Sequence, residues 1–304
     1  NTVVSIDSYD TFIDVNGKKV FLENAMKKYD DGYYINAHVL EEGFGYTYKW
    51  DSVENTLNLV DTKKDESILP SRYSYYDVGR LGKIKDQGIY GTCWAFASLT
   101  AVETSLMPEE KYDFSEDNMV WNSGYFGAQY DGGDYTRAIS YLASWRGPVL
   151  EEDDVYGDGI NNSDAGVVKH VQEAQIIESK NLEAIKKAVF LYGGVESSLY
   201  TSMSYAGERS MYYNDKNYSY CYIGTKKPNH DVVIIGWDDN YSKDNFSVSL
   251  EGNGAFICVN SWGDSFGDDG LFYVSYYDSN IGIHNVVYTR VEDNDNYDNI
   301  YQSD

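Results

Sequence analysis

Cysteine and proline are both scarce in this chain, which has three cysteines and four prolines among its 304 residues. Three cysteines exclude a framework of disulfide bonds of the kind that holds many small secreted domains together. Long hydrophobic runs are also absent, because no stretch approaches the ~18 apolar residues that a membrane-spanning helix needs. No signal peptide is recognisable at Asn1, so we expect that any such segment was removed or lies outside this sequence.

Basic residues are few as well, since 24 Lys and Arg stand against 49 Asp and Glu and give a formal net charge of −25. A nucleic-acid-binding surface needs clustered positive charge, so this balance argues against a nucleic-acid partner. We interpret the acidic excess as a solubilising surface. The length favours one large or two modest domains, and 42% hydrophobic residues are enough for a core.

The most informative stretch that is present is Gln87-Gly-Ile-Tyr-Gly-Thr-Cys-Trp-Ala-Phe96. After Cys93, apolar residues recur at helical spacing, which predicts a half-buried helix that Pro108 ends. Cys93 would then lie in the first turn, where the helix dipole favours a thiolate, the nucleophilic form of the side chain. Gln87 is carried on a glycine-containing loop, from which it would form an oxyanion hole with the backbone N–H of Cys93.

A lone cysteine in an apolar helix is more often a buried small residue than a nucleophile. Two polar residues far downstream favour the nucleophile. His230 begins a strand-like run, Val232 to Trp237, and Asn260 directly follows another, Ala255 to Val259. Strands hold side chains rigidly, and a fixed histidine next to a polar partner is what an activated thiol requires.

Together these motifs resemble the papain family of cysteine proteases. The resemblance is carried by Gln87, Cys93-Trp-Ala-Phe96, His230 and Asn260-Ser-Trp-Gly263. It implies an α+β fold with two lobes, one helical and one resembling a β-barrel. It also implies a Cys-His-Asn site that hydrolyses peptide bonds without a cofactor, in which His230 exchanges protons with Cys93 and Asn260 orients the His230 ring.

The resemblance also predicts the substrate-binding residues. Gly132 and Gly133 resemble the glycine pair that holds the substrate backbone in the family, and glycine permits such a close approach. Trp262 is expected to shield the site from water, and Asn229 to contribute to the pocket for the second substrate residue. Asp231 stands where most members have a small residue, and an alternating strand would turn it away from the site.

The cysteine pattern departs from that of plant and animal members. These usually bridge a cysteine three residues before the nucleophile to one just before the glycine pair. Tyr90 and Tyr130 occupy the two positions here, which indicates that the pair has been replaced as a unit. We therefore expect Cys221 and Cys258 to be buried thiols.

The same comparison with the family predicts the domain boundaries. Leu69-Pro70 resembles the mature start of such enzymes, so the protease domain is expected over residues 69–290, after a charged linker at 63–68. Residues 1–62 resemble a small α+β module named after the N-terminal domain of copper amine oxidases, without implying copper, because His38 stands alone. The acidic residues 291–304 resemble a stretch that leads into a lectin-like domain in clostridial cell-surface cysteine proteases, so we expect the start of a truncated domain there.

Local signals predict several elements. An Asn-Gly turn at residues 16–17 predicts a hairpin over Ile13–Val20. Helices are expected from Cys93, after Gly133 and over residues 180–190. The family resemblance implies a further helix with Ser115 as its N-cap. The acidic stretch 151–164 has oxygen ligands that Ca²⁺ would accept, but its spacing fits no EF-hand, and a solvated loop is the favoured interpretation. The remaining strands are predicted at residues 195–200, 271–277 and 284–290.

We therefore expect a cysteine endopeptidase that acts as a monomer on protein or peptide substrates, including cell-wall or surface-layer proteins. The resemblance, together with 31 tyrosines, favours an extracellular or cell-wall location in a Gram-positive bacterium. Two alternatives stay open. Residues 1–62 are a spacer, an anchor or an inhibitory prodomain that blocks the cleft of a zymogen. The protease-like domain itself is either a protease or a catalytically silent, papain-like surface-binding module.

Overall fold

A computed structural model describes the chain in two compact units, Asn1–Leu69 and Pro70–Asp304. The described residues are 4–6, 12–15, 18–21, 26–29, 32–36, 38–40, 46–51, 56–61, 69–124 and 129–294. The predicted linker at 63–68 and residues 295–304 of the predicted acidic tail lie outside them. Each unit is described by itself.

The first unit contains short antiparallel strands. Strands β1 (Val4–Ile6), β2 (Phe12–Val15) and β3 (Lys18–Phe21) form one sheet. Val15 of β2 lies opposite Lys18 of β3, which confirms the pairing predicted from the Asn-Gly signal, although the turn itself lies outside the described residues. Two further pairs are β4 (Met26–Tyr29) with β5 (Gly32–Ile35), and β6 (Tyr46–Asp51) with β7 (Thr56–Asp61).

The second unit is built on a nine-stranded sheet in the order β11-β12-β15-β14-β13-β10-β16-β9, with β8 also paired to β13. The strand bounds are Arg72–Ser74 (β8), Lys169–Ile176 (β9), Val195–Leu199 (β10), Tyr213–Asn214 (β11), Ser219–Tyr220 (β12), His230–Asp238 (β13), Ala255–Val259 (β14), Leu271–Ser275 (β15) and Asn285–Asp293 (β16). The five strands predicted in this half of the chain are all present. Residues 291–293 of the predicted tail belong to β16.

Among the described residues, four α-helices accompany this sheet, at Cys93–Leu106 (α1), Glu116–Asn122 (α2), Tyr135–Ala143 (α3) and Leu182–Leu191 (α4). The starts of α2, α3 and α4 follow from local chemistry, because the side chains of Ser115, Asp134 and Asn181 each accept a backbone N–H at the N-cap. Helix α1 ends at Leu106, shortly before Pro108, as predicted.

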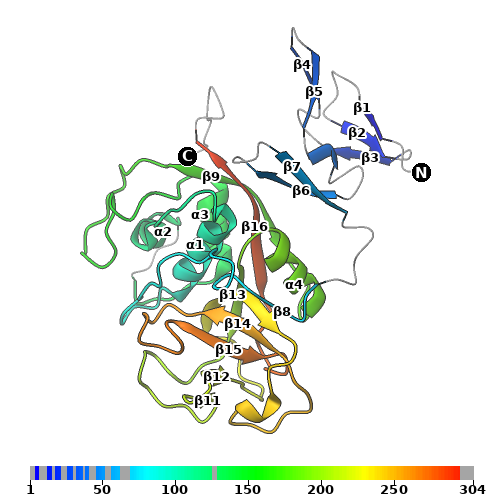
Figure 1. Ribbon diagram of the computed structural model, residues 1–304. Coiled ribbons are helices and arrows are strands. Elements are labelled where there is room, and N and C mark those ends of the chain that lie inside the picture. The colour runs from blue at the N-terminus through cyan, green and yellow to red at the C-terminus, as the bar shows by residue number, and fades with distance from the viewer. Residues whose placement is uncertain are drawn as a thin grey trace. The chain divides into compact units, whose positions relative to one another are not determined.

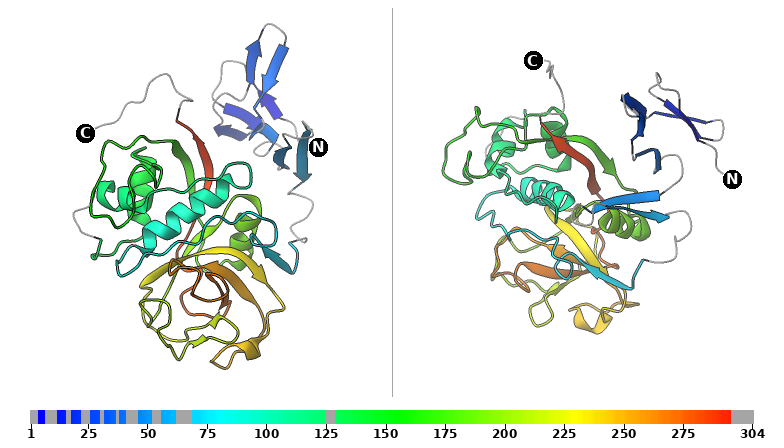
Figure 2. Two further views of the ribbon diagram at one scale, coloured as in Figure 1. Left: turned by 60° about the vertical axis from the view of Figure 1, so that its left-hand side comes forward. Right: turned by 45° about the horizontal axis from the view of Figure 1, so that its top comes forward.

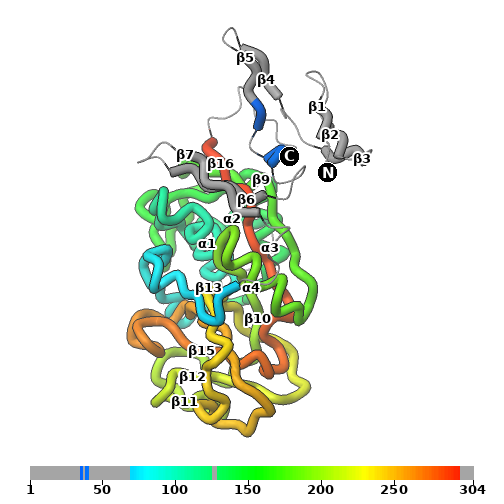
Figure 3. Tube along the Cα trace, turned by 45° about the vertical axis from the view of Figure 1, so that its right-hand side comes forward, coloured from blue at the N-terminus to red at the C-terminus, as the bar shows by residue number. Residues whose placement is uncertain are grey.

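The helices and strands of this unit separate into two groups. Figure 1 shows α1, α2 and α3 in one half and β11, β12, β14 and β15 in the other. The turned views keep the groups apart (Figure 2, Figure 3). Helix α1 packs against β13, β10 and β16. The predicted α+β class with a helical and a β lobe is confirmed.

Candidate active site

Cys93 is the first residue of α1, and its neighbours on the helix are buried while its own side chain keeps partial exposure. Thr92 is the N-cap but makes no side-chain capping hydrogen bond, so the first turn leaves backbone N–H groups available. Cys221 and Cys258 are unpaired and fully buried, as predicted. Cys93 is therefore the thiol that a reagent or substrate can reach.

His230 and Asn260 are brought together by neighbouring strands. β13 begins at His230 and pairs antiparallel with β14, Val233 opposite Val259, so the start of one strand lies beside the end of the other. Nε2 of His230 lies 2.8 Å from Oδ1 of Asn260. Because this oxygen only accepts, Nε2 carries the hydrogen and Nδ1 is left to exchange a proton.

Trp262 covers this pair. Its ring centroid lies 4.9 Å from that of His230, and the residue is 3% exposed. An apolar cover excludes water that would compete for the hydrogen bond between His230 and Asn260. This position supports the shielding role that the family resemblance implies.

The Cys93 sulfur faces the start of β13, because the backbone N–H of Asp231 interacts with it and lowers the pKa of the thiol, as does that of Trp94. Burial is the larger influence and raises the pKa of Cys93, and the Asp231 carboxylate raises it further. Burial also lowers the pKa of His230 to about 4. Burial thus opposes the charged form of both groups, whereas the helix terminus considered alone favours a thiolate.

Gln87 is fixed from three sides. Its backbone N–H donates to the Ser261 carbonyl at 2.8 Å, and its Oε1 accepts from the Ser261 hydroxyl at 2.6 Å. Nε2 donates one hydrogen to the Tyr90 carbonyl at 2.7 Å and retains a second hydrogen for another acceptor. Ser261 thus orients the Gln87 amide, a contact across 174 residues that no local pattern predicts.

The predicted substrate-binding residues differ in what surrounds them. Gly132 has φ of +72°, and a Cβ on Gly133 would lie 2.5 Å from Nε1 of Trp94, so Gly133 has a packing requirement beside the nucleophile. Both side-chain ends of Asn229 bind the backbone of Thr201, at 2.7 and 2.9 Å. This favours a role for Asn229 in fixing the loop before the histidine strand.

Asp231 is closer to the chemistry than the alternation of the strand predicted. Its carboxylate is buried and accepts from the Ser198 hydroxyl at 2.6 Å. Burial is the largest cause that raises the pKa of Asp231 to about 6, and Asp134 adds to the shift while the Ser198 hydroxyl opposes it. Asp231 also acts on the thiol of Cys93, whose pKa its carboxylate raises. The expectation that Asp231 matters little stays a prediction, which substitution of this residue tests.

Tyr90 and Tyr130, which replace the family's cysteine pair, pack with ring centroids 5.0 Å apart. The adjacent backbone adds a hydrogen bond from Gly91 N–H to the Gln129 carbonyl at 2.8 Å. The two loops are thus joined by an aromatic contact in place of a covalent bond.

In the acidic loop 151–164, the Asp154 carboxylate accepts hydrogen bonds from α2 and from the loop backbone. Asp154 accepts from Asn118 Nδ2 at 2.9 Å and from the Asn162 backbone at 3.0 Å. Throughout the described part of the chain, no group of three or more His, Cys, Asp or Glu residues is arranged to hold a metal ion. No helix in that part is long and apolar enough to cross a membrane.

Comparisons with known proteins identify the family of the chain. Residues 69–291 match the papain family cysteine proteases, and residues 1–59 match the copper amine oxidase N-terminal domain. A cysteine protease of Blomia tropicalis is 25% identical over 289 residues, which cover 88% of this chain and 78% of that protein.

Solved structures extend the comparison. The clostridial cysteine protease Cwp84 after propeptide cleavage is 33% identical with a TM-score of 0.68, covering 77% of this chain and 61% of that one. Bromelain from Ananas comosus, in complex with the E64 inhibitor, has a TM-score of 0.57 at 20% identity, covers 73% of this chain and 99% of that one, and supports the fold alone. These matches confirm the predicted papain-like fold, and the chain belongs to the papain family of cysteine proteases.

Proposed function

We propose that the chain is a cysteine endopeptidase in which Cys93 is the nucleophile, His230 the general acid and base, and Asn260 the residue that orients His230. The observation that carries this assignment is the hydrogen bond between His230 and Asn260 at 2.8 Å. His230 begins β13, and the backbone N–H of the next residue, Asp231, contacts the Cys93 sulfur. Gln87 and the Cys93 N–H provide the oxyanion hole. Gly132, Gly133 and Trp262 line the substrate-binding region.

In this mechanism, the thiol proton passes from Cys93 to Nδ1 of His230 as the sulfur attacks the peptide carbonyl. The resulting imidazolium is stabilised by Asn260, whose hydrogen bond raises the pKa of His230 against the effect of burial. His230 then protonates the leaving amine and afterwards takes a proton from the water that hydrolyses the acyl-enzyme. The remaining hydrogen of Gln87 Nε2 stabilises the tetrahedral oxyanion.

Two measurements test the assignment. Cys93→Ala should abolish cleavage of casein and of a fluorogenic peptide, while Cys221→Ala, at a buried thiol elsewhere in the fold, should retain it. An E-64-type epoxide should modify Cys93 alone. Undiminished turnover in Cys93→Ala, or labelling of Cys221 or Cys258 instead, would refute the assignment of the nucleophile. Absence of any cleavage by the wild type would favour the silent binding module.

The natural substrates we propose are proteins at a bacterial cell surface, including surface-layer proteins, reached by a secreted, monomeric enzyme that needs no cofactor. The support is similarity to Cwp84, whose protease and lectin-like domains come from a surface-layer-associated protein of Clostridium difficile. That match is 32% identical with a TM-score of 0.66, and the chain spans 53% of that structure's length. Digestion of purified surface-layer protein, compared with casein at equal concentration, tests the preference.

Residues 1–62 are a prodomain, a spacer or an anchor, and the similarity to Cwp84 after propeptide cleavage favours the prodomain. A specific protease site placed in residues 63–68 of the full chain separates the alternatives. If peptide hydrolysis rises after the cut, residues 1–62 act as an inhibitory prodomain. If it stays constant, they act as a spacer or an anchor.

A further inference from the structure

The hydroxyl of Tyr156 joins the two ends of the loop that carries the proposed oxyanion donors. It donates to the Gln87 carbonyl at 2.9 Å and lies 2.6 Å from the Thr92 hydroxyl. Because a phenol has one hydrogen, the Thr92 hydroxyl is the donor in the second contact. Gln87 supplies one oxyanion donor, and Thr92 is the N-cap residue directly before Cys93, which supplies the other.

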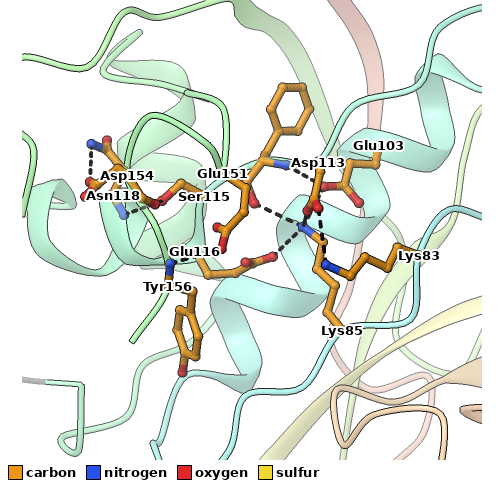
Figure 4. A network of polar contacts seen from close by, with 11 residues as sticks. Lys83, Lys85, Glu103, Asp113, Ser115, Glu116, Asn118, Glu151, Asp154 and Tyr156 are labelled. Atoms are coloured by element: carbon orange, nitrogen blue, oxygen red, sulfur yellow. Dashed lines mark hydrogen bonds and ion pairs between the residues drawn. The ribbon is translucent and has the colours of Figure 1, made fainter. Parts of the chain in front are cut away.

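Tyr156 is itself held firmly, although it lies in the acidic loop. Figure 4 shows its backbone N–H directed at the Glu151 carboxylate, 3.0 Å away. The next residue, Gly157, donates to Asp117 at 2.9 Å, and the Ser115 hydroxyl donates to the Asp154 carbonyl at 2.5 Å. These bonds attach the segment 154–157 to helix α2 and its N-cap, which gives the hydroxyl a fixed support.

The ring of Tyr156 is fixed as well. It packs edge-on against Phe96 of helix α1, with centroids 4.8 Å apart, and against Tyr90 of the oxyanion loop at 6.0 Å. Burial raises the pKa of Tyr156, so the phenol stays protonated and remains a donor. The hydroxyl therefore has both the position and the protonation state to hold the Gln87 carbonyl.

We propose that Tyr156 is a positioning residue for the oxyanion hole: through Thr92 and the Gln87 carbonyl it fixes the separation of the Gln87 amide and the Cys93 N–H. This inference rests on the proposed peptidase function. Tyr156 touches neither the substrate nor the reacting atoms. Its contribution is confined to steps in which an oxyanion forms, because only those steps use the two donors together.

The test is Tyr156→Phe in the full chain, which keeps the ring contacts and removes the hydroxyl. We expect kcat for a fluorogenic peptide to fall about 10-fold, because removing an oxyanion donor outright costs ~10²–10³ and here the donor is only loosened. KM should change by less than about 2-fold, because ground-state binding does not depend on these donors. Alkylation of Cys93 by iodoacetamide forms no oxyanion and should keep its rate.

Tyr75→Phe is the matched control. Tyr75 is fully buried, and its hydroxyl donates to the Val189 carbonyl, away from this loop, so the variant loses a bond of the same kind. Both variants should lower the thermal unfolding midpoint, but only Tyr156→Phe should lower kcat. An unchanged kcat in Tyr156→Phe, or an equal fall in Tyr75→Phe, would show that the hydroxyl acts on stability alone.

Thr92→Val tests the chain of hydrogen bonds itself. It removes the Thr92 donor but leaves the bond from Tyr156 to Gln87, so kcat should fall less than in Tyr156→Phe. The double variant should match Tyr156→Phe, because the two hydroxyls act through one connection. A double variant whose loss equals the product of the single losses would overturn the connection. If wild type shows no cleavage that depends on Cys93, it is the proposed function that fails.

Discussion

Lys85 is the buried cation in an acidic cluster beside the oxyanion loop (Figure 4). The other cation drawn there, Lys83, is exposed. The Lys85 ammonium lies 2.7 Å from Glu103 of α1 and 2.8 Å from Glu116 of α2, and all three side chains are 8% exposed or less. It also donates to the Phe114 carbonyl at 3.0 Å. Burial lowers the pKa of Lys85, but the nearby carboxylates outweigh it and hold the pKa well above its usual value.

We predict that Lys85→Met destabilises the second unit by about 3–5 kcal/mol, because it leaves buried carboxyl groups without their cation. For a unit of this size, that corresponds to a fall of about 6–20 °C in the unfolding midpoint. Lys83→Met is the control. Lys83 is 75% exposed and lies 3.7 Å from Asp113, so its loss should cost at most about 1 kcal/mol.

The loss in Lys85→Met should also depend on pH. Burial already raises the pKa values of Glu103 and Glu116, that of Glu116 to about 8, and Lys85 opposes the shift. Without Lys85 the folded protein holds these protons more tightly still, so its stability falls more steeply as pH rises from 5 to 8. Thermal unfolding at both pH values measures this. A variant as stable as Lys83→Met, or a loss that does not grow with pH, would refute the assignment of Lys85 as the cluster's essential charge.

Three further predictions concern single groups. Burial raises the pKa of Glu116 from its usual 4.5 to about 8, so the folded state binds more protons than the unfolded state between these pH values. The free energy of unfolding should therefore fall as pH rises through this window. Urea unfolding of Glu116→Gln should show a flatter dependence of this free energy on pH. Asp231→Asn removes a charge that raises the pKa of Cys93, so the pH profile of Cys93 alkylation should move to lower pH, and an unmoved profile would contradict the coupling. Asn260→Ala removes the hydrogen bond to His230, which is worth about 1.5–3 kcal/mol once the ring is charged. We expect kcat to fall about 10- to 100-fold with KM nearly unchanged. A change in KM alone, with kcat unchanged, would indicate a structural role for Asn260.

Elements that depend on neighbours in the sequence were predictable. The N-cap at Ser115, the helix that begins at Cys93 and the strand at 255–259 each follow from a few adjacent residues, and the structure places all three as predicted. Strand β9, Lys169–Ile176, escaped prediction because its sequence is largely polar. Its buried Lys169 is accommodated by an ion pair with Glu110 at 2.7 Å, a contact from a distant part of the chain.

The residues of the candidate site likewise fall into those that adjacent sequence predicts and those that depend on distant contacts. Gln87, Cys93, His230 and Asn260 are proposed from the sequence because each stands in a run of characteristic neighbours. The contacts of Ser261 and Tyr156 are encoded by no spacing. The protonation states also depend on the assembled fold. A helix terminus taken alone predicts a thiolate at Cys93, but burial and the Asp231 carboxylate reverse the direction of the pKa. The electrostatic surroundings of the proposed nucleophile therefore follow from the assembled fold and not from the helix terminus alone.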